Sequence, residues 1–443
     1  MNLGEALAWL DRHQDLERII ADKRLHAPRP ERMRGFAHLM GDPQNAQPAI
    51  HLTGTNGKTS TARALTQLLI SKGLTVGTSI SPHLERLNER IMVDLEPISD
   101  DDLAEVLSDL AILEPLAGES MRPTWFELIT AAAFRYFADR PVDVTVLEVG
   151  MGGRWDATNV TDASVSIVTN VALDHTELLG PSREHIAREK AGIVKPGATL
   201  VLGETDPALY GIFAGEGPAA LWLAGRDFAV ESNLMAVGGR VLDLRTPGGR
   251  YEDVYLPLHG RHQADNFLCA LAGAEAFFGK PVEGEIVAET AALVTSPGRM
   301  EVVRQHPLVV LDGAKNVAGA QSSAAAVAEE FGEDRPRVIV VGMLRGKDAL
   351  EMLEALDAPK ARLVVACPPP SPRAQPATEV AEAARALGCR ALVRASVAEA
   401  LETALSEAGP DELVLVTGSL YTVGAARSMA RQHLGLEREA HPR

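Results

Sequence analysis

The chain has 443 residues, of which 46% are hydrophobic and 23% charged, and its net charge is −17. This composition excludes a disordered or fibrous protein and indicates a globular chain of two or three domains. The acidic surface and the aromatic content of only 4% argue against nucleic-acid binding, which uses basic surfaces and aromatic rings that stack on bases.

The first twenty residues, MNLGEALAWLDRHQDLERII, have the apolar spacing of an amphipathic helix. They lack the basic start, the apolar run and the cleavage site of a signal peptide, so we expect none. No apolar stretch is long enough to predict a membrane span. The three cysteines lack metal-ligand spacing and indicate a reduced, cytoplasmic protein.

A glycine-rich stretch, HLTGTNGKTS (51–60), joins an apolar strand pattern to the helix pattern TARALTQLLISKG. Its glycines, Gly54 and Gly57, are three residues apart, whereas the common phosphate-binding loop sets them five apart. Backbone N–H groups would face phosphates, Lys58 would reach the β- and γ-oxygens, and Thr59 or Ser60 would face a magnesium ion. The stretch predicts a nucleotide site, the alternative being a turn that only joins strand and helix.

Two further strand patterns, VDVTVLEVG and SVSIVTNVALDH, end near Glu148 and His175. Ligands bind beyond the carboxyl ends of parallel strands, and a carboxylate buried there needs a cation. For Glu148 that cation is either a phosphate-bound Mg²⁺ or an arginine such as Arg154. For His175, spacing alone favours a hydrogen-bonded core residue over a metal ligand, because magnesium prefers oxygen.

Lys190 lies on the apolar face of the helix pattern REHIAREKAGIVK, together with Ile186, Ile193 and Val194. Its side chain can extend outward to solvent. Alternatively, burial favours the neutral amine, which CO₂ can convert to an anionic, metal-binding carbamate.

The pattern of apolar residues and turns changes in the second half of the chain. Residues 221–257 indicate β-hairpins, HQADNFLCALAGAEAFFG indicates a helix, and LVTSPGRMEVV (293–303) indicates a hinge. After the hinge, four strands (PLVVLDG, RVIVVGML, ARLVVACP and ELVLVTGS) alternate with Ala-rich helices, the pattern of a parallel α/β domain. We predict an α/β protein with domains 1–297 and 298–443.

Several ordered stretches resemble the Mur ligase superfamily, in its folylpolyglutamate synthase and bifunctional dihydrofolate synthase branch. They span nearly all of the chain after residue 50: GTNGKTS, SPHLERLNERI, PTWFE, LEVGMGGRWDATN, LDHTELLG, REKAGI, HQADN, SPGRME, LDGAKN, VVGMLRGKD and VTGSLY. The shortened glycine loop is normal for that superfamily. The resemblance implies a P-loop ATPase domain that also binds folate, followed by a smaller Rossmann-like glutamate ligase domain.

The resemblance also implies site residues. Lys58, Glu148, His175 and Lys190 are implied as catalytic, with Lys190 carbamylated. The implied ATP contacts are Gly54, Thr55, Asn56, Gly57, Lys58, Thr59, Ser60, Asn266, Arg299, Asp312 and Lys315. The implied metal ligands are Ser81, Glu148 and His175, and the implied pterin contacts are Thr124, Phe126, Trp155, Asp156 and Ala157.

Three positions depart from the family pattern. Lys315 stands where the family has histidine, so a cation can still meet ATP oxygens but stacking on adenine is lost. Val317 replaces a proline, and Thr59 stands where many relatives have glycine, which leaves the loop hydroxyl open between Thr59 and Ser60.

The implied activity is ATP-dependent addition of L-glutamate to dihydropteroate and to reduced folates through an acyl phosphate. ATP and Mg²⁺ are the implied cofactors, and the resemblance allows a monovalent cation. We expect a monomer acting on small molecules, without nucleic-acid or membrane partners. The alternatives are a monofunctional folylpolyglutamate synthase, a Mur-type ligase acting on a UDP-sugar, and a nucleotide-hydrolysing switch.

Overall fold

The computed structural model describes residues 1–15 and 30–433. They form two compact units, one of residues 1–15, 30–257 and 262–295 and the other of residues 258–261 and 296–433. The expected N-terminal helix is α1 (Leu3–Leu10), capped by Asn2, and residues 16–20 of that prediction lie outside the described residues. In the described parts of the chain, no helix has the length and apolar character to cross a membrane.

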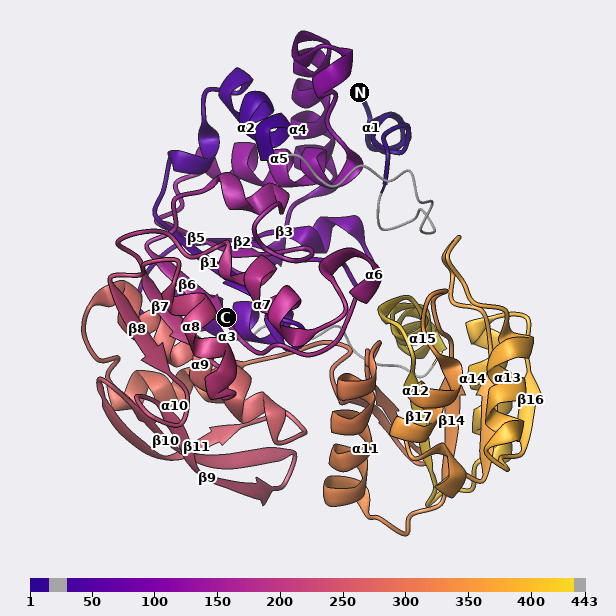
Figure 1. Cartoon of the computed structure of the whole chain (residues 1–443). Coiled ribbons are helices and arrows are strands. Elements are labelled where there is room, and N and C mark those ends of the chain that lie inside the picture. Colours follow the sequence, from indigo (N-terminus) through magenta and orange to yellow (C-terminus); the bar gives the residue numbers. More distant parts are fainter. Residues whose placement is uncertain (16–29, 434–443) are drawn as a thin grey trace. The chain divides into compact units, whose positions relative to one another are not determined.

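The first unit is built on an eight-stranded sheet in the order β4-β3-β2-β5-β1-β6-β7-β8 (Figure 1). The six strands from β2 to β8 in this order are parallel, and β3 and β4 are antiparallel. The strands are β1 (Ala49–Thr53), β2 (Val76–Ser79), β3 (Ile91–Val93), β4 (Glu96–Pro97), β5 (Val144–Glu148), β6 (Val165–Val168), β7 (Thr199–Leu202) and β8 (Ala220–Leu223). Because the central strands β1, β5 and β6 are parallel neighbours, the segments that follow them leave the same edge of the sheet.

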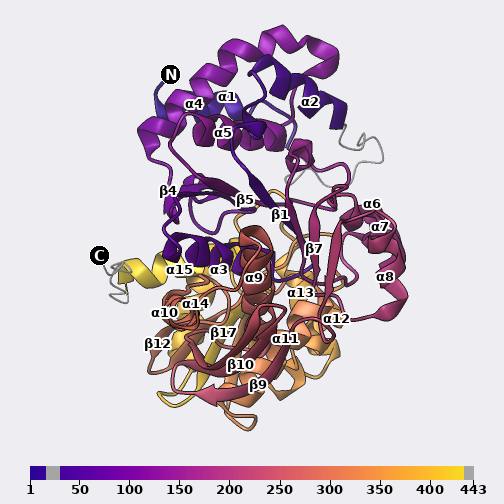
Figure 2. The ribbon, with the colours of Figure 1, turned by 90° about the vertical axis from the view of Figure 1, so that its left-hand side faces the viewer.

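Helices cover both faces of this sheet. In Figure 2, α4 (Asp100–Leu113) and α5 (Trp125–Ala138) lie on one side, and α3 (Lys58–Ser71) and α9 (His262–Phe278) lie on the other. The remaining helices are α2 (Pro30–Leu39), α6 (Thr176–Leu179), α7 (Arg183–Ala191), α8 (Pro207–Ala214), α10 (Gly284–Leu293) and the 3₁₀ turns η1 (Pro43–Asn45), η2 (Leu87–Arg90), η3 (Glu114–Ala117), η4 (Glu119–Met121) and η5 (Ala157–Val160). The sheet is therefore a buried layer, as its apolar strands predict.

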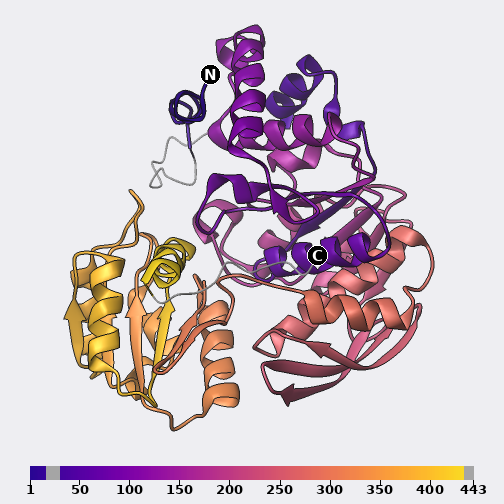
Figure 3. The same ribbon diagram turned by 180° about the vertical axis from the view of Figure 1, so that it is seen from behind.

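The hairpin prediction for residues 221–257 is correct only in part. Strands β9 (Ala229–Ala236), β10 (Gly239–Thr246) and β11 (Gly249–Leu256) form an antiparallel three-stranded sheet, which packs against α10 and α9 (Figure 3). Strand β8, however, pairs in parallel with β7 at the edge of the main sheet. Its short apolar run carried no signal that distinguishes a hairpin strand from a parallel edge strand.

The second unit has a six-stranded sheet in the order β12-β13-β17-β14-β15-β16, in which only β12 is antiparallel. The four predicted strands are β13 (Leu308–Leu311), β14 (Arg337–Val341), β15 (Leu363–Ala366) and β17 (Leu413–Thr417), whereas β12 (Glu301–Gln305) and β16 (Ala391–Val393) were not predicted. The helices are α11 (Val317–Phe331), α12 (Ala349–Ala355), α13 (Ala377–Ala386), α14 (Val397–Glu407), α15 (Leu420–His433) and the turn η6 (Ala358–Lys360). The expected parallel α/β domain is confirmed.

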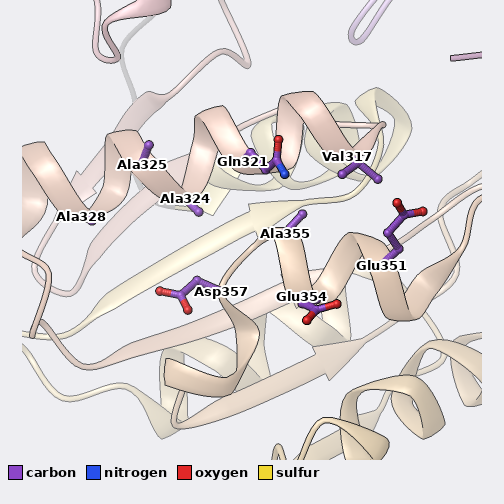
Figure 4. A pocket seen from close by; sticks show the side chains of 9 residues that line it. All are labelled: Val317, Gln321, Ala324, Ala325, Ala328, Glu351, Glu354, Ala355 and Asp357. Atoms are coloured by element: carbon purple, nitrogen blue, oxygen red, sulfur yellow. The ribbon is translucent and has the colours of Figure 1, made fainter. Parts of the chain in front are cut away.

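A hollow of about 570 Å³ lies between α11 and α12 of the second unit (Figure 4). Alanines of α11 form one wall, and the carboxylates of Glu351, Glu354 and Asp357 lie on the other side. None of the implied nucleotide contacts lines it, so we do not assign it to the predicted site.

The central strand β1 buries a histidine completely. His51 has no exposed surface, and its Nε2 lies 2.8 Å from the hydroxyl of Thr158. Burial, with a smaller contribution from the positive charge of Lys195, lowers the pKa of His51 from 6.5 to about 3. The imidazole is therefore neutral in the folded protein at neutral pH.

This burial makes the first unit sensitive to acid. Below pH 6.5 only the unfolded chain protonates His51, so the free energy of unfolding should fall by roughly 2 kcal/mol between pH 6.5 and about pH 4.5 from this residue. Relative to wild type, His51→Gln should lose that part of the pH dependence, whereas His38→Gln, at a side chain 83% exposed, should keep it. Urea unfolding followed by tryptophan fluorescence measures this, because all four tryptophans lie in the first unit. Identical pH slopes in wild type and His51→Gln would contradict the assignment.

Candidate functional site

The glycine loop connects β1 to α3, and contacts from the neighbouring strand end fix its backbone. The amide N–H of Thr55 donates to Asn170 O at 3.0 Å, and that of Asn56 donates to Asn170 Oδ1 at 3.0 Å. The hydroxyl of Thr169 donates to Asn56 O at 2.7 Å. Two residues that directly follow β6 therefore hold the loop in one conformation.

Gly57 ends the loop where only glycine fits. Its φ of +82° is left-handed, and a Cβ there would lie 2.1 Å from Asn266 Oδ1. Asn266 comes from α9 and donates to Gln263 Oε1. The structure therefore brings the implied nucleotide contact Asn266 against the loop.

Replacing Gly57 with alanine should raise the KM for ATP by at least about tenfold, because the loop must move away from Asn266. The left-handed φ should cost a further ~1 kcal/mol of stability. Gly73→Ala is the matched control: Gly73 follows the other end of α3 with a φ of +84°, and no atom lies within 4 Å of the position that a Cβ would take there. Steady-state kinetics and thermal unfolding compare the two, and equal KM values would rule out a close-contact role for Gly57.

Glu148, the last residue of β5, lies against the start of α3. It is 2% exposed, and Thr59 Oγ1 donates to both of its carboxylate oxygens at 3.1 and 3.0 Å. The amide of Ser81 donates to Glu148 Oε2 at 3.3 Å. Arg154, the alternative partner of Glu148, instead pairs with Glu216.

This cluster fits a magnesium ion. Ser81 is buried, and its hydroxyl has no hydrogen-bond partner among the described residues, so an oxygen ligand beside the Glu148 carboxylate is left for a cation. Carboxylate and hydroxyl oxygens suit Mg²⁺. No group of three or more His, Cys, Asp or Glu side chains within residues 1–15 and 30–433 could hold a metal; Mg²⁺ commonly binds one or two carboxylates and completes its coordination with water and phosphate oxygens.

His175 does not directly follow a strand, contrary to the expectation. Strand β6 ends at Val168, and irregular backbone separates it from His175, which has a φ of +50° before α6. Its Nε2 lies 3.8 Å from Asp174 Oδ2. Thr55 bonds to Ala172 in the same segment, which connects the segment to the glycine loop. The role of His175 as a ligand stays a prediction.

Lys190 is buried, so of the two alternatives the side chain that extends to solvent is wrong. It is 3% exposed, and its Nζ donates to Gly54 O at 2.7 Å. Lys58 Nζ donates to the same carbonyl oxygen at 3.1 Å. Two lysine amines from different helices thus meet at one atom of the glycine loop. Helix α7 ends at Ala191, so Ile193 and Val194 are buried beyond the helix rather than on it.

The implied pterin contacts gather near the segment that follows Glu148. Thr124 caps α5 with a capping box, in which Glu127 Oε2 accepts from the Thr124 amide at 2.7 Å and from its hydroxyl at 2.8 Å. A Cβ on Gly150 would lie 2.5 Å from the Phe126 ring. Gly152 likewise lies against the ring of Trp155. The loop glycines therefore allow close packing on two aromatic rings.

Asp156 fixes the same segment from inside. It is 3% exposed, and its carboxylate accepts from the Met151 amide at 3.0 Å and from the Thr158 amide at 2.9 Å. Burial raises the pKa of Asp156, against the opposite effect of these hydrogen bonds. Ala157 is buried and begins η5.

In the second unit, Arg299 and Asp312 lie close together at the carboxyl end of β13. Asp312 accepts from the amides of Met300 at 3.1 Å and Ala314 at 3.2 Å. Arg299 donates to Gly313 O at 3.2 Å. Lys315 is half-buried one residue before the N-cap of α11, Asn316.

Several supporting residues were not predicted from the sequence. Arg32 donates from Nε to Glu127 at 2.7 Å, and this ion pair is largely buried. Asn170 supports the glycine loop, and a polar pair after an apolar strand (Thr169–Asn170) could have indicated it. The Arg32–Glu127 pair spans 95 positions, and nothing in the local pattern predicts it.

Comparisons with known proteins identify the family of the chain. Residues 52–274 match the Mur ligase middle domain, and residues 298–420 match the Mur ligase glutamate ligase domain. The chain is 39% identical to the dihydrofolate synthase/folylpolyglutamate synthase of Mycobacterium tuberculosis, over 91% of this chain and 90% of that protein. It is 33% identical to the Bacillus subtilis protein of the same name, over 89% and 93%.

Solved structures give the same result. The M. tuberculosis folylpolyglutamate synthase complexed with ADP and AMPPCP superposes with a TM-score of 0.88 at 38% identity, covering 97% of this chain and 98% of that one. Escherichia coli FolC in complex with DHPP and ADP superposes with a TM-score of 0.85 at 30% identity, covering 98% and 99%. The α/β fold and the resemblance inferred from the motifs are confirmed. The chain belongs to the Mur ligase family and, within it, to the dihydrofolate synthase/folylpolyglutamate synthase group.

Proposed function

We propose that this protein uses ATP to join L-glutamate to dihydropteroate and to reduced folates. One observation at the glycine loop carries the proposal. Lys58 Nζ and Lys190 Nζ both donate to Gly54 O, and Thr59 Oγ1 donates to the buried Glu148. A cation for phosphate (Lys58), an acidic residue for a metal (Glu148) and the lysine that we expect to be carbamylated (Lys190) thus lie around one loop. The names of the similar proteins support the identity of the acid and of the amino acid.

The chemistry follows from the charge on the acceptor. A carboxylate is a poor electrophile, so one of its oxygens first attacks the γ-phosphorus of ATP, giving an acyl phosphate and ADP. The α-amine of glutamate then attacks the acyl carbon, inorganic phosphate leaves with the bonding electrons, and the amine loses a proton to give the amide. No covalent bond to the enzyme forms.

The chain's own residues supply binding and charge compensation. Lys58 would stabilise the negative charge on the transferring phosphoryl group, and the N-terminus of α3 would face the phosphates. Glu148, Ser81 and His175 would hold Mg²⁺, which when bound neutralises phosphate charge. We propose a carbamate on Lys190 as a further anion beside that site. A monovalent cation is a further candidate cofactor.

The remaining implied residues complete the proposal. Residues 1–297 would bind ATP and folate and residues 298–443 would act as the glutamate ligase domain, with Asn266, Arg299, Asp312 and Lys315 contacting nucleotide. Thr124, Phe126 and the segment 155–157 would face the pterin. We further propose a cytoplasmic monomer acting on small molecules: three free, buried cysteines fit a reducing compartment, and a net charge of −17 disfavours nucleic-acid binding.

Product analysis tests the proposal. The protein is incubated with Mg·ATP, L-glutamate and one acceptor at a time: dihydropteroate, tetrahydrofolate or a UDP-linked sugar acid. The expected result is one ADP for each product that is heavier by one glutamyl unit, with both pterin acceptors. Turnover with tetrahydrofolate alone would indicate a monofunctional enzyme, and ADP without any amide product would refute the ligase assignment.

A further inference from the structure

The side chains of His51, Thr158 and Asp156 form a buried hydrogen-bonded network, and Asp156 belongs to the segment 150–157. His51 Nε2 lies 2.8 Å from Thr158 Oγ1, and Thr158 Oγ1 donates to Asp156 Oδ1 at 2.6 Å. All three residues are at most 3% exposed. The network joins the central strand β1 to η5, two elements that are about 100 residues apart in the sequence.

The donors in this network have one consistent assignment. Asp156 is surrounded by N–H and O–H donors from Met151 and Thr158, so its carboxylate accepts every bond. The Thr158 hydroxyl gives its single proton to Asp156 and therefore accepts from His51 Nε2–H. The other ring nitrogen, Nδ1, is buried and has no partner among the described residues, which agrees with a neutral imidazole protonated on Nε2.

Through Asp156, the network also restrains the backbone of the segment 150–157, which contains implied pterin contacts. Its second oxygen, Oδ2, holds the Met151 amide at 3.0 Å, and the adjacent Gly150 lies against the Phe126 ring. From the other end, Arg154 N donates to Glu189 O at 2.8 Å, next to Lys190. The orientation of one carboxylate therefore affects the backbone between Phe126 and helix α7.

We propose that His51 and Thr158 are positioning residues for the acid substrate: they fix Asp156, and through it the segment 150–157, in the conformation that binds the pterin. This inference rests on the proposed function. An apolar residue at position 51 would fill the strand equally well but would leave the Thr158 hydroxyl free to rotate away from Asp156. The network supplies orientation and takes no part in the transfer of the phosphoryl group.

Isosteric variants test the proposal. Thr158→Val removes the hydroxyl and Thr158→Ser keeps it. His51→Leu removes the donor, whereas the side-chain amide of His51→Gln can replace it. Thr158→Val and His51→Leu should raise the KM for dihydropteroate at least about tenfold while the KM for ATP stays within about twofold, and the Ser and Gln variants should lie within about threefold of wild type. The split between the two KM values and the rescue separate positioning from a general loss of folding.

The experiment distinguishes failure of this inference from failure of the proposed function. Failure of the wild-type protein to ligate dihydropteroate would refute the proposed function and this inference with it. If the wild type is active, the inference is overturned when Thr158→Val keeps the wild-type KM for dihydropteroate, or when both KM values rise together. If Thr158→Val does not fold, the pair His51→Leu and His51→Gln decides by the same criteria.

Discussion

Lys58→Ala should lower kcat by at least about 100-fold while the protein stays folded. Lys58 opens helix α3, and its amine lies 3.1 Å from Gly54 O in the glycine loop. The negative charge on the γ-phosphoryl group must be compensated during transfer, and losing one such electrostatic group costs about 10²–10³ in kcat. Steady-state release of ADP in the presence of dihydropteroate and glutamate measures the effect.

Lys72→Ala provides the matched control on the same helix. Lys72 caps the other end of α3 and pairs with Glu283, whose side chain is 56% exposed. The Lys72 side chain is 12% exposed, but an ion pair with an exposed partner contributes at most about 1 kcal/mol and this one lies at the end of α3 opposite the glycine loop, so this variant should keep its kcat within about twofold. Full turnover by Lys58→Ala would show that the loop does not hold the transferred phosphate.

Lys190→Arg should be as inactive as Lys190→Ala, with kcat reduced by about 100-fold. Arginine keeps a positive charge at this buried position, which is 3% exposed, but it cannot form a carbamate. If instead the cation itself were needed beside Gly54 O, arginine would preserve part of the activity. The comparison of the two variants therefore distinguishes an anionic from a cationic role, and kcat is the measurement.

A control variant, CO₂ depletion and mass spectrometry test the carbamate further. Lys195→Arg is the control, because Lys195 lies on the segment that follows α7 and donates to Asn159 O at 3.2 Å, so its kcat should stay within about twofold of wild type. Depleting CO₂ should lower the activity of the wild type, and restoring bicarbonate should recover it. Near-normal turnover of Lys190→Arg, or an unmodified lysine in the active protein by mass spectrometry, would eliminate the carbamate.

Much of the site was predictable because its residues lie at the ends of strands or in the loop that follows one. Lys58 and Glu148 stand next to apolar runs that the structure shows as β1 and β5, and parallel pairing of these strands brings their ends together. For these two residues a short local pattern, together with one rule of sheet topology, is sufficient. The helical spacing of Lys190 with Ile186 placed it on the apolar face but left burial and extension to solvent both open, and the structure shows that it is buried.

Other features could not be predicted, because they depend on pairing between distant side chains. Nothing in the sequence around His51 indicates its hydrogen-bond partner, and only the fold places Thr158 beside it. The predicted position of His175 was wrong because the apolar run from 164 continues past the true end of β6 at Val168. The hairpin prediction for β8 was wrong because a four-residue apolar run does not reveal its partner.

Activation of the acid by phosphorylation is the central claim, and oxygen-isotope transfer tests it directly. Dihydropteroate labelled with ¹⁸O in its carboxylate is incubated with unlabelled ATP, L-glutamate and the protein, and the released phosphate is analysed by mass spectrometry. We predict one ¹⁸O atom in each phosphate released, because a carboxylate oxygen leaves with the phosphoryl group when the amide forms. Amide product accompanied by unlabelled phosphate would contradict an acyl phosphate and, with it, the proposed role of the glycine loop.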